Sequence, residues 1–126
     1  MVGLVKLHHV SFAIKDLDAS KKFFGEVLGL PEIVRPGFNF SGAWYALGDR
    51  QLHLISEPSK SSDGPRRLTR ADHVALEVRD VEAVKTTLSD NGIDYQLGGN
   101  SDLGMEQVFC RDPDGHVIEF VYYHDR

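Results

Sequence analysis

The chain has 126 residues, of which 41% are hydrophobic and 26% charged, and its formal net charge is −5. This length suits a single domain with a packed core, and the acidic balance argues against nucleic acid as a partner. No apolar run is long enough to span a membrane, and residues 1–6 lack the pattern of a signal peptide. The one cysteine, Cys110, rules out an internal disulfide and fits a reducing compartment, so we expect a cytoplasmic protein.

Residues 7–16 are repeated later in the chain as residues 71–80. His9 aligns with His73, and apolar residues alternate with other residues in both copies, which is the pattern of a half-buried strand. We therefore predict a strand in each copy, with the two histidines on the face opposite the apolar residues. An internal repeat of this kind predicts two similar structural modules.

The first module, at about residues 5–55, continues from this strand with a helix. Apolar residues recur at helical spacing over residues 16–28, Asp16 or Asp18 can cap the N-terminus, and Gly29 supplies a stop. We expect the helix to pack on the apolar face of the first strand. Three further strands are predicted, at residues 32–34, 44–47 and 51–55, the last two forming a hairpin around a turn that contains a glycine.

The second module, at about residues 71–122, repeats this order after a linker at residues 56–70. The basic cluster at residues 66–70 is either solvated linker charge or a site for an anionic substrate or partner. In the second module we predict a helix at 81–91, strands at 93–96, 105–110 and 117–121, a loop at 97–104 and a turn at 112–115. Residues 98–102 are either a mobile lid or simply a loop.

Four polar side chains occupy equivalent positions in the two copies: His9 and His73 on the first strands, and His53 and Glu119 on the last. By strand alternation all four point away from the apolar faces, and they would converge if a pseudo-two-fold relates the modules. Three imidazoles and one carboxylate suit a divalent first-row metal. Each residue alone has a structural interpretation, but their shared placement favours a joint metal site. His8, His116 and His124 lack this placement, and Cys110 is expected to be a core residue.

Taken together, these features resemble the vicinal oxygen chelate superfamily, which includes glyoxalase I, methylmalonyl-CoA epimerase, fosfomycin-resistance thiol transferases and extradiol dioxygenases. The resemblance rests on the tandem modules with a strand histidine, on residues 23–30 (FFGEVLGL) and on residues 111–119 (RDPDGHVIE). Residues 35–44 (RPGFNFSGAW) resemble a glyoxalase I-like branch that has plant members. The resemblance implies an α+β fold, in which two tandem β-α-β-β-β modules form a cupped mixed sheet around one metal site. It makes residues 1–126 a single glyoxalase-like domain.

For function, the resemblance implies a metal-dependent lyase or isomerase acting on a small oxygen-chelating substrate, such as the hemithioacetal of methylglyoxal and a thiol. The metal would be Ni, Zn, Co, Mn or Fe, and glutathione is a candidate co-substrate. Glu119 matches the carboxylate that serves as ligand and base. His53 departs from the glyoxalase pattern, which generally has a second carboxylate or an amide there. Either Glu119 performs both proton transfers, or His53 stays off the metal and shuttles protons.

Three alternative functions remain open. His9, His73 and Glu119 also make the 2-His-1-carboxylate triad of non-haem Fe(II) dioxygenases, with His53 as a nearby acid or base. Extradiol enzymes usually have a second pair of modules, which this chain lacks. A fosfomycin-type thiol transferase would need a potassium-binding loop that is not evident here, and a non-catalytic binder would not need the four metal-ligating residues.

Candidate substrate contacts are Arg35, Phe38, Phe40 and Trp44, although aromatic residues in β-rich domains often belong to the core. Glu77 shares the His73 face, so it is either a second proton-transfer carboxylate or a solvent-facing residue. Homodimers are common in the superfamily, and the linker is long enough for two chains to exchange modules. The site would then lie within one chain or across two.

Overall fold

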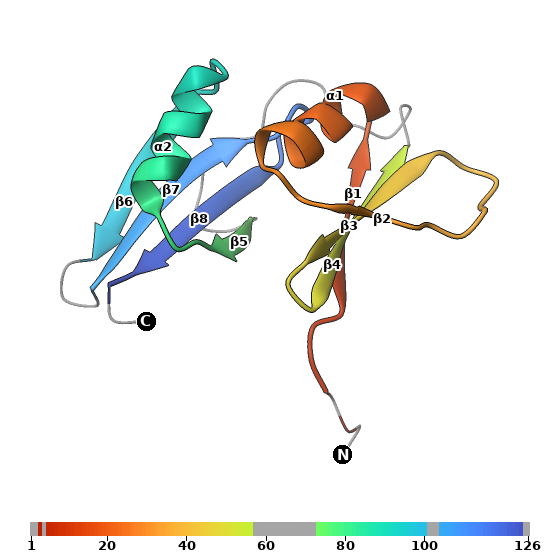
Figure 1. Ribbon diagram of the computed structural model, residues 1–126, viewed down its shortest axis with the longest axis horizontal. Helices are drawn as coiled ribbons and strands as arrows, with labels where there is room; N and C mark the ends of the chain where they lie inside the picture. The colour runs from red at the N-terminus through yellow and green to blue at the C-terminus, as the bar shows by residue number, and fades with distance from the viewer. Residues whose placement is uncertain (1–2, 4, 57–72, 101–103, 125–126) are drawn as a thin grey trace. The chain divides into compact units, whose positions relative to one another are not determined.

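A computed structural model describes residues 3, 5–56, 73–100 and 104–124 (Figure 1). The chain divides into two compact units, Met1–Ser61 and Ser62–Arg126. The predicted linker beyond Ser56, with its basic cluster, lies outside the described residues. Each unit carries one four-stranded mixed sheet and a helical segment, which confirms the predicted α+β class and tandem modules.

In the first unit the strand order is β1-β4-β3-β2. The strands are β1 (His9–Ile14), β2 (Glu32–Ile33), β3 (Gly42–Leu47) and β4 (Arg50–Ser56). The outer strand β1 runs parallel to β4, and the remaining pairs are antiparallel. The predicted hairpin is present as β3 and β4, joined at Gly48 and Asp49, and both strands are longer than predicted.

The predicted helix at residues 16–28 differs in its second half. It begins as α1 (Leu17–Lys21), where the Asp16 carboxylate caps the N-terminus by accepting the Ala19 N–H at 3.1 Å. It then widens into a π-helical segment, η1 (Lys22–Val27). This wider turn carries two consecutive aromatic residues, Phe23 and Phe24, into the interior. The ring of Phe24 lies 5.9 Å from that of Phe12 on β1, as the expected packing requires.

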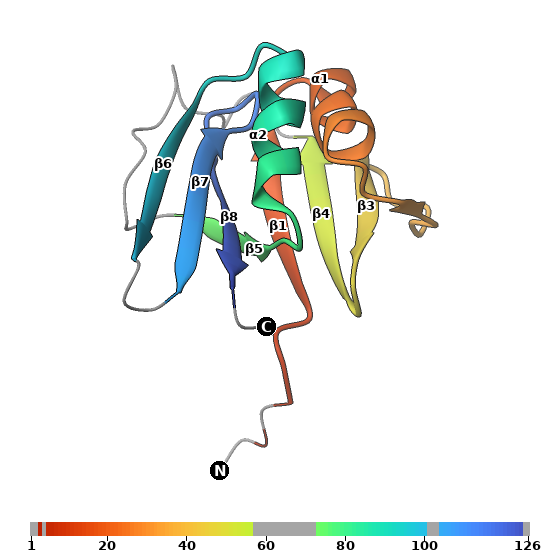
Figure 2. The same cartoon turned by 60° about the vertical axis from the view of Figure 1, so that its left-hand side comes forward.

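The second unit repeats the topology, with strand order β5-β8-β7-β6. Its elements are β5 (Val74–Glu77), α2 (Val81–Asp90), β6 (Tyr95–Asn100), β7 (Met105–Arg111) and β8 (Val117–Tyr123). Asp80 caps α2 through the Ala83 N–H, in the same way that Asp16 caps α1. Helix α2 packs on β7 and β8. Figure 2 shows β6, β7 and β8 side by side in that order.

Strand β6 continues to Asn100, where a loop from residue 97 was expected. The glycines at 98 and 99 are poor strand formers, but the antiparallel ladder with β7 satisfies their backbone groups. A Cβ at Gly98 would lie 3.0 Å from the Gln107 amide oxygen, so glycine gives the Gln107 side chain room. Residues 101 and 102 of the proposed lid lie outside the described residues.

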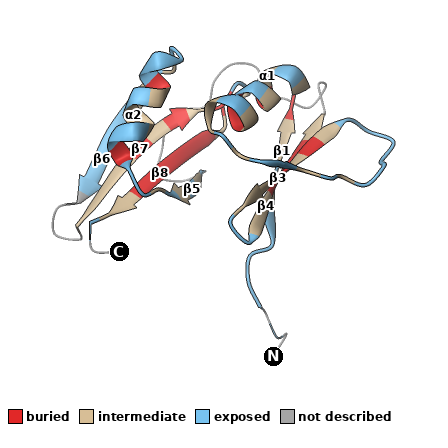
Figure 3. Cartoon of the chain, in the orientation of Figure 1, coloured by how far each residue is buried: buried red, intermediate tan, exposed pale blue. Residues whose placement is uncertain are grey.

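The core of each unit lies between its sheet and its helix. In the second unit, buried residues follow β8 over much of its length (Figure 3). Cys110 is fully buried on β7, and burial raises the pKa of its thiol to about 12, which fits the core role expected of it. Among the described helices, none is both long and apolar enough to cross a membrane.

Candidate metal centre

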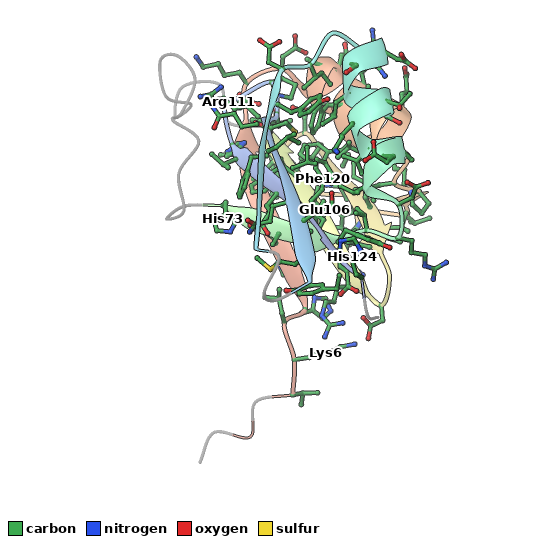
Figure 4. All side chains as sticks on the ribbon, turned by 90° about the vertical axis from the view of Figure 1, so that its left-hand side faces the viewer. Lys6, His73, Glu106, Arg111, Phe120 and His124 are labelled. Atoms are coloured by element: carbon green, nitrogen blue, oxygen red, sulfur yellow. The ribbon has the colours of Figure 1, made fainter. Side chains whose placement is uncertain are left out.

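Strands β5 and β8 bring His73 and Glu119 together in the second unit. His73 precedes β5 directly, and Glu119 lies in the middle of β8 (His73 is labelled in Figure 4). The Nε2 atom of His73 lies 3.0 Å from Oε1 of Glu119. The Glu119 side chain is only 8% exposed, whereas that of His73 is 24% exposed. The nearly buried Glu119 carboxylate therefore lies beside the His73 imidazole, which solvent can reach.

Gln107 on β7 supports this pair from the other side. Its Nε2 amide donates a hydrogen bond of 3.1 Å to Oε2 of Glu119. In the β7–β8 ladder Phe109 lies opposite Glu119, so Gln107 is a diagonal neighbour two residues away. Both carboxylate oxygens thus have a partner, which fixes the side chain although it is buried.

The geometry of the pair fits a shared cation. Two ligand atoms about 2.1 Å from a metal lie about 3 Å apart at right angles and about 3.4 Å apart in tetrahedral geometry, while a direct hydrogen bond also spans about 3 Å. The separation of the His73 nitrogen and the Glu119 oxygen is 3.0 Å. An imidazole and a carboxylate are also ordinary ligands of first-row divalent ions.

In the first unit, His9 and His53 are neighbours on β1 and β4. Their rings are stacked with centroids 4.1 Å apart, and Trp44 on β3 stacks on His53 at 4.0 Å. The Nε2 atom of His53 lies 2.8 Å from the Gln51 amide oxygen, to which an Nε2–H would donate. His53 is buried between these rings, whereas His9, at the start of β1, is exposed.

The environment of His53 favours its neutral form. Burial lowers its pKa below the usual range, and the positive charges that His9, His8 and Arg35 carry when protonated act in the same direction. The Nδ1 atoms of His8 and His9 lie 2.9 Å apart. A neutral imidazole is the form that binds a metal or accepts a proton.

Within the units, the four predicted ligands lie as two neighbouring pairs, His9 with His53 and His73 with Glu119. Within either unit, the described residues gather no set of three or more His, Cys, Asp or Glu side chains suited to a metal. Each unit supplies two ligand candidates, and the four-residue site remains a prediction.

Two residues near these pairs, Gln51 and Gln107, were not singled out from the sequence. Gln51 precedes His53 by two residues, so strand alternation alone would have put both on one face. Gln107 gives no such signal, because its contact with Glu119 depends on the register of β7 against β8.

The predicted substrate residues fall into two groups. Arg35 lies over Phe38 and Phe40, and Phe38 lies 6.0 Å from Trp44, so these residues form one cluster in the first unit. Glu77 is exposed at the end of β5, and the alternating burial of that strand places it on the less buried face.

The remaining histidines have other partners. His116 Nδ1 lies 2.8 Å from the buried Asp112 carboxylate in the β7–β8 turn. His124 lies 3.0 Å from Glu106 in a much more exposed ion pair (both are labelled in Figure 4).

Comparisons with known proteins agree with this architecture. Residues 6–120 match the sequence model of the Glyoxalase/Bleomycin resistance protein/Dioxygenase superfamily. The chain belongs to this superfamily. It is 33% identical over 121 residues to "Glyoxylase I 4" of Arabidopsis thaliana, covering 92% of this chain and 70% of the relative. A lactoylglutathione lyase of Neisseria meningitidis serogroup A is 30% identical, with 93% and 90% covered.

Members of the superfamily differ in their chemistry. A relative from Geobacillus genomosp. 3 is named a manganese-dependent 2,3-dihydroxybiphenyl 1,2-dioxygenase; it is 28% identical, and the match covers 94% of this chain but 37% of the relative. The crystal structure of a glyoxalase/dioxygenase from Nostoc punctiforme superposes with a TM-score of 0.79 at 26% identity, with 96% and 92% covered. The family is therefore established, and the reaction has to be argued from the side chains.

Proposed function

We propose that this protein is a divalent-metal-dependent lyase or isomerase of the glyoxalase I type. Its substrate would be a small oxygen-chelating molecule, such as the hemithioacetal of methylglyoxal and a thiol, with glutathione as a candidate thiol. The single observation that carries the proposal is the buried Glu119 carboxylate, which has His73 on one oxygen and Gln107 on the other. The relatives named as glyoxalase and lactoylglutathione lyase support the reaction class.

His9, His53, His73 and Glu119 would hold the metal, within one chain or across a homodimer. The ion, which could be Ni, Zn, Co, Mn or Fe, would act as a Lewis acid on two adjacent substrate oxygens. Glu119 would accept the proton from the carbon that carries the hydroxyl oxygen, next to the carbonyl carbon, because a carboxylate fixed at both oxygens loses little freedom on reacting. His53, neutral in its surroundings, would bind the metal or carry the proton onward.

One observation favours a second candidate, an Fe(II) or Mn(II) dioxygenase. His53 is stacked between His9 and Trp44 and lies within hydrogen-bond distance of Gln51. If His53 keeps these contacts, His9, His73 and Glu119 remain as a 2-His-1-carboxylate triad. The manganese-dependent relative gives this alternative a precedent in the family.

The test begins with the metal content of the purified protein and with hemithioacetal turnover after each of the five metals is restored to the apo-protein. We expect Ni or Zn to restore turnover, and Glu119→Gln to abolish it. Glu106→Gln is the matched control, because Glu106 also lies 3.0 Å from a histidine but its side chain is 38% exposed, against 8% for Glu119. If Glu119→Gln were as active as Glu106→Gln, Glu119 would not be the base.

The same preparation separates the two candidates. Iron or manganese that co-purifies, with no hemithioacetal consumed under any metal, would contradict the lyase assignment. Oxygen uptake with catechols would then support the dioxygenase. A protein that binds no metal stoichiometrically would contradict the metal site itself.

A further inference from the structure

The guanidinium of Arg35 has few partners in the described part of the chain. Its Nη2 donates a 2.7 Å hydrogen bond to the Phe40 carbonyl oxygen, and its Nε is buried without a hydrogen-bond partner among the described residues. Among the described residues, no carboxylate forms an ion pair with this guanidinium. A buried donor without an acceptor is unfavourable, and such a group in a native structure calls for an explanation.

Two phenyl rings hold the guanidinium in place. Its central carbon lies 4.9 Å from the Phe38 ring centroid and 5.0 Å from that of Phe40, and the two rings are stacked. We call these three residues the Arg35 clamp. Gly42 makes room beneath it, because a Cβ there would lie 3.2 Å from Nε and Nη2 and would overlap the Leu54 carbonyl oxygen. The arginine is therefore built into the fold of the first unit.

The clamp is also open to solvent, unlike an ordinary aromatic core. Phe38 is 45% exposed and Phe40 is 43% exposed. Large apolar side chains exposed together with a fixed charge are typical of ligand-binding surfaces.

A row of rings connects the clamp to the candidate metal ligands. Phe38 lies 6.0 Å from Trp44, Trp44 lies 4.0 Å from His53, and His53 lies 4.1 Å from His9, all in the first unit. Because Trp44, His53 and His9 are stacked face to face, a ligand would lie along the edges of these rings, with the clamp at one end and the exposed His9 at the other.

From this arrangement we infer that the Arg35 clamp binds a carboxylate of the substrate, carried on a flat or apolar body whose oxygen-chelating end lies at His9. This inference rests on the proposed function and assigns the acid group of its substrate to a named residue of this chain. A carboxylate is favoured because its planar pair of oxygens can accept from the Nη1 and Nη2 ends of the guanidinium together, whereas Nε is buried. The phenyl rings would contact the apolar body of the same molecule.

Binding can be tested without metal or turnover. Trp44 is the only tryptophan of the chain, so its fluorescence reports on ligands near the clamp. The full-length protein, kept metal-free with a chelator, is titrated with benzoate and with benzamide, which has the same ring but no charge. We expect saturable binding of benzoate that is roughly 10- to 100-fold tighter than that of benzamide.

Arg35→Gln should remove the preference for benzoate, and Arg35→Lys, which keeps the charge but loses the fork, should weaken it roughly tenfold. Arg50→Gln is the matched control, since Arg50 is another arginine of the first unit that already pairs with Asp49. Circular dichroism verifies that each variant is folded. Equal binding of benzoate and benzamide, or benzoate binding unchanged in Arg35→Gln, would overturn the inference. Tighter binding of phenylphosphonate than of benzoate would overturn the choice of a carboxylate.

Turnover provides the second measurement. For a hemithioacetal made from a thiol with a carboxylate, Arg35→Gln should raise KM roughly tenfold and leave kcat unchanged, whereas the methyl ester of that thiol should be unaffected. If no hemithioacetal reacts but benzoate binding still depends on Arg35, the proposed function is wrong and carboxylate binding by the clamp is supported. If turnover occurs but Arg35→Gln binds benzoate as well as the wild type, the clamp inference is wrong and the proposed function is supported.

Discussion

Replacing Gln107 by leucine tests how far the second unit prepares Glu119 for a metal. The substitution removes the 3.1 Å hydrogen bond to Oε2 and leaves the other oxygen beside His73. A hydrogen bond to a charged group contributes about 1.5–3 kcal/mol, and the loss of a residue that orients a metal ligand typically weakens affinity about 10- to 100-fold. Because the carboxylate is only 8% exposed, little water can replace the lost amide. We expect the dissociation constant for Zn²⁺ to rise within that range.

Isothermal titration calorimetry of the apo-protein with Zn²⁺ measures the effect. Gln96→Leu is the matched control, because Gln96 is an exposed glutamine on the neighbouring strand β6. Urea unfolding of both variants separates a loss of stability from a loss of affinity. Unchanged Zn²⁺ affinity in Gln107→Leu, together with a large loss in Glu119→Gln, would refute the positioning role of Gln107.

Three further predictions concern the second unit. Gly98→Ala should lower Zn²⁺ affinity by up to about tenfold with little change in the urea midpoint, because the new methyl group displaces the flexible Gln107 amide. Unaltered affinity would show that the methyl group does not displace this amide from Glu119. Asp112→Ala should lower the free energy of unfolding in urea by about 3 kcal/mol or more, because the buried carboxylate accepts hydrogen bonds from the backbone N–H groups of Asp114 and His116 and from the His116 ring. A loss under about 1 kcal/mol would contradict this account. With a pKa of about 12, roughly one Cys110 thiol in ten thousand is ionised at pH 8, so Ellman's reagent should react with it only after denaturation. Rapid labelling of the native protein would show that the Cys110 thiol is not buried.

Much of the fold followed from local signals in the sequence. The alternating residues after His9 and His73 predicted strands, and Asp16 and Asp80 cap the two helical segments through the same contact three residues on. The turn at residues 112–115 was predicted from its Pro and Gly, and its backbone closes through the Gly115 N–H and the Asp112 carbonyl oxygen. Such features depend on neighbours in the chain, so a single sequence contains them.

The features missed depend on neighbours that are distant in the chain. Gly98 and Gly99 disfavour strand structure, but they belong to β6 because both pair with residues of β7. The π-helical turn buries both Phe23 and Phe24, a choice that helical periodicity does not encode. Gln107 meets Glu119 only through the register between β7 and β8.

The two units keep one topology but have diverged in what surrounds their equivalent residues. In the ladders, His53 lies opposite Trp44, and Glu119 lies opposite Phe109. The imidazole is stacked between two rings, whereas the carboxylate is fixed by an amide. A neutral group in one unit and an anion in the other would give the proposed site a single charged base. Proton removal would then occur from one side of the substrate only. His53→Glu should therefore change which substrate enantiomer reacts, and chiral analysis of the hemithioacetal consumed would detect that change.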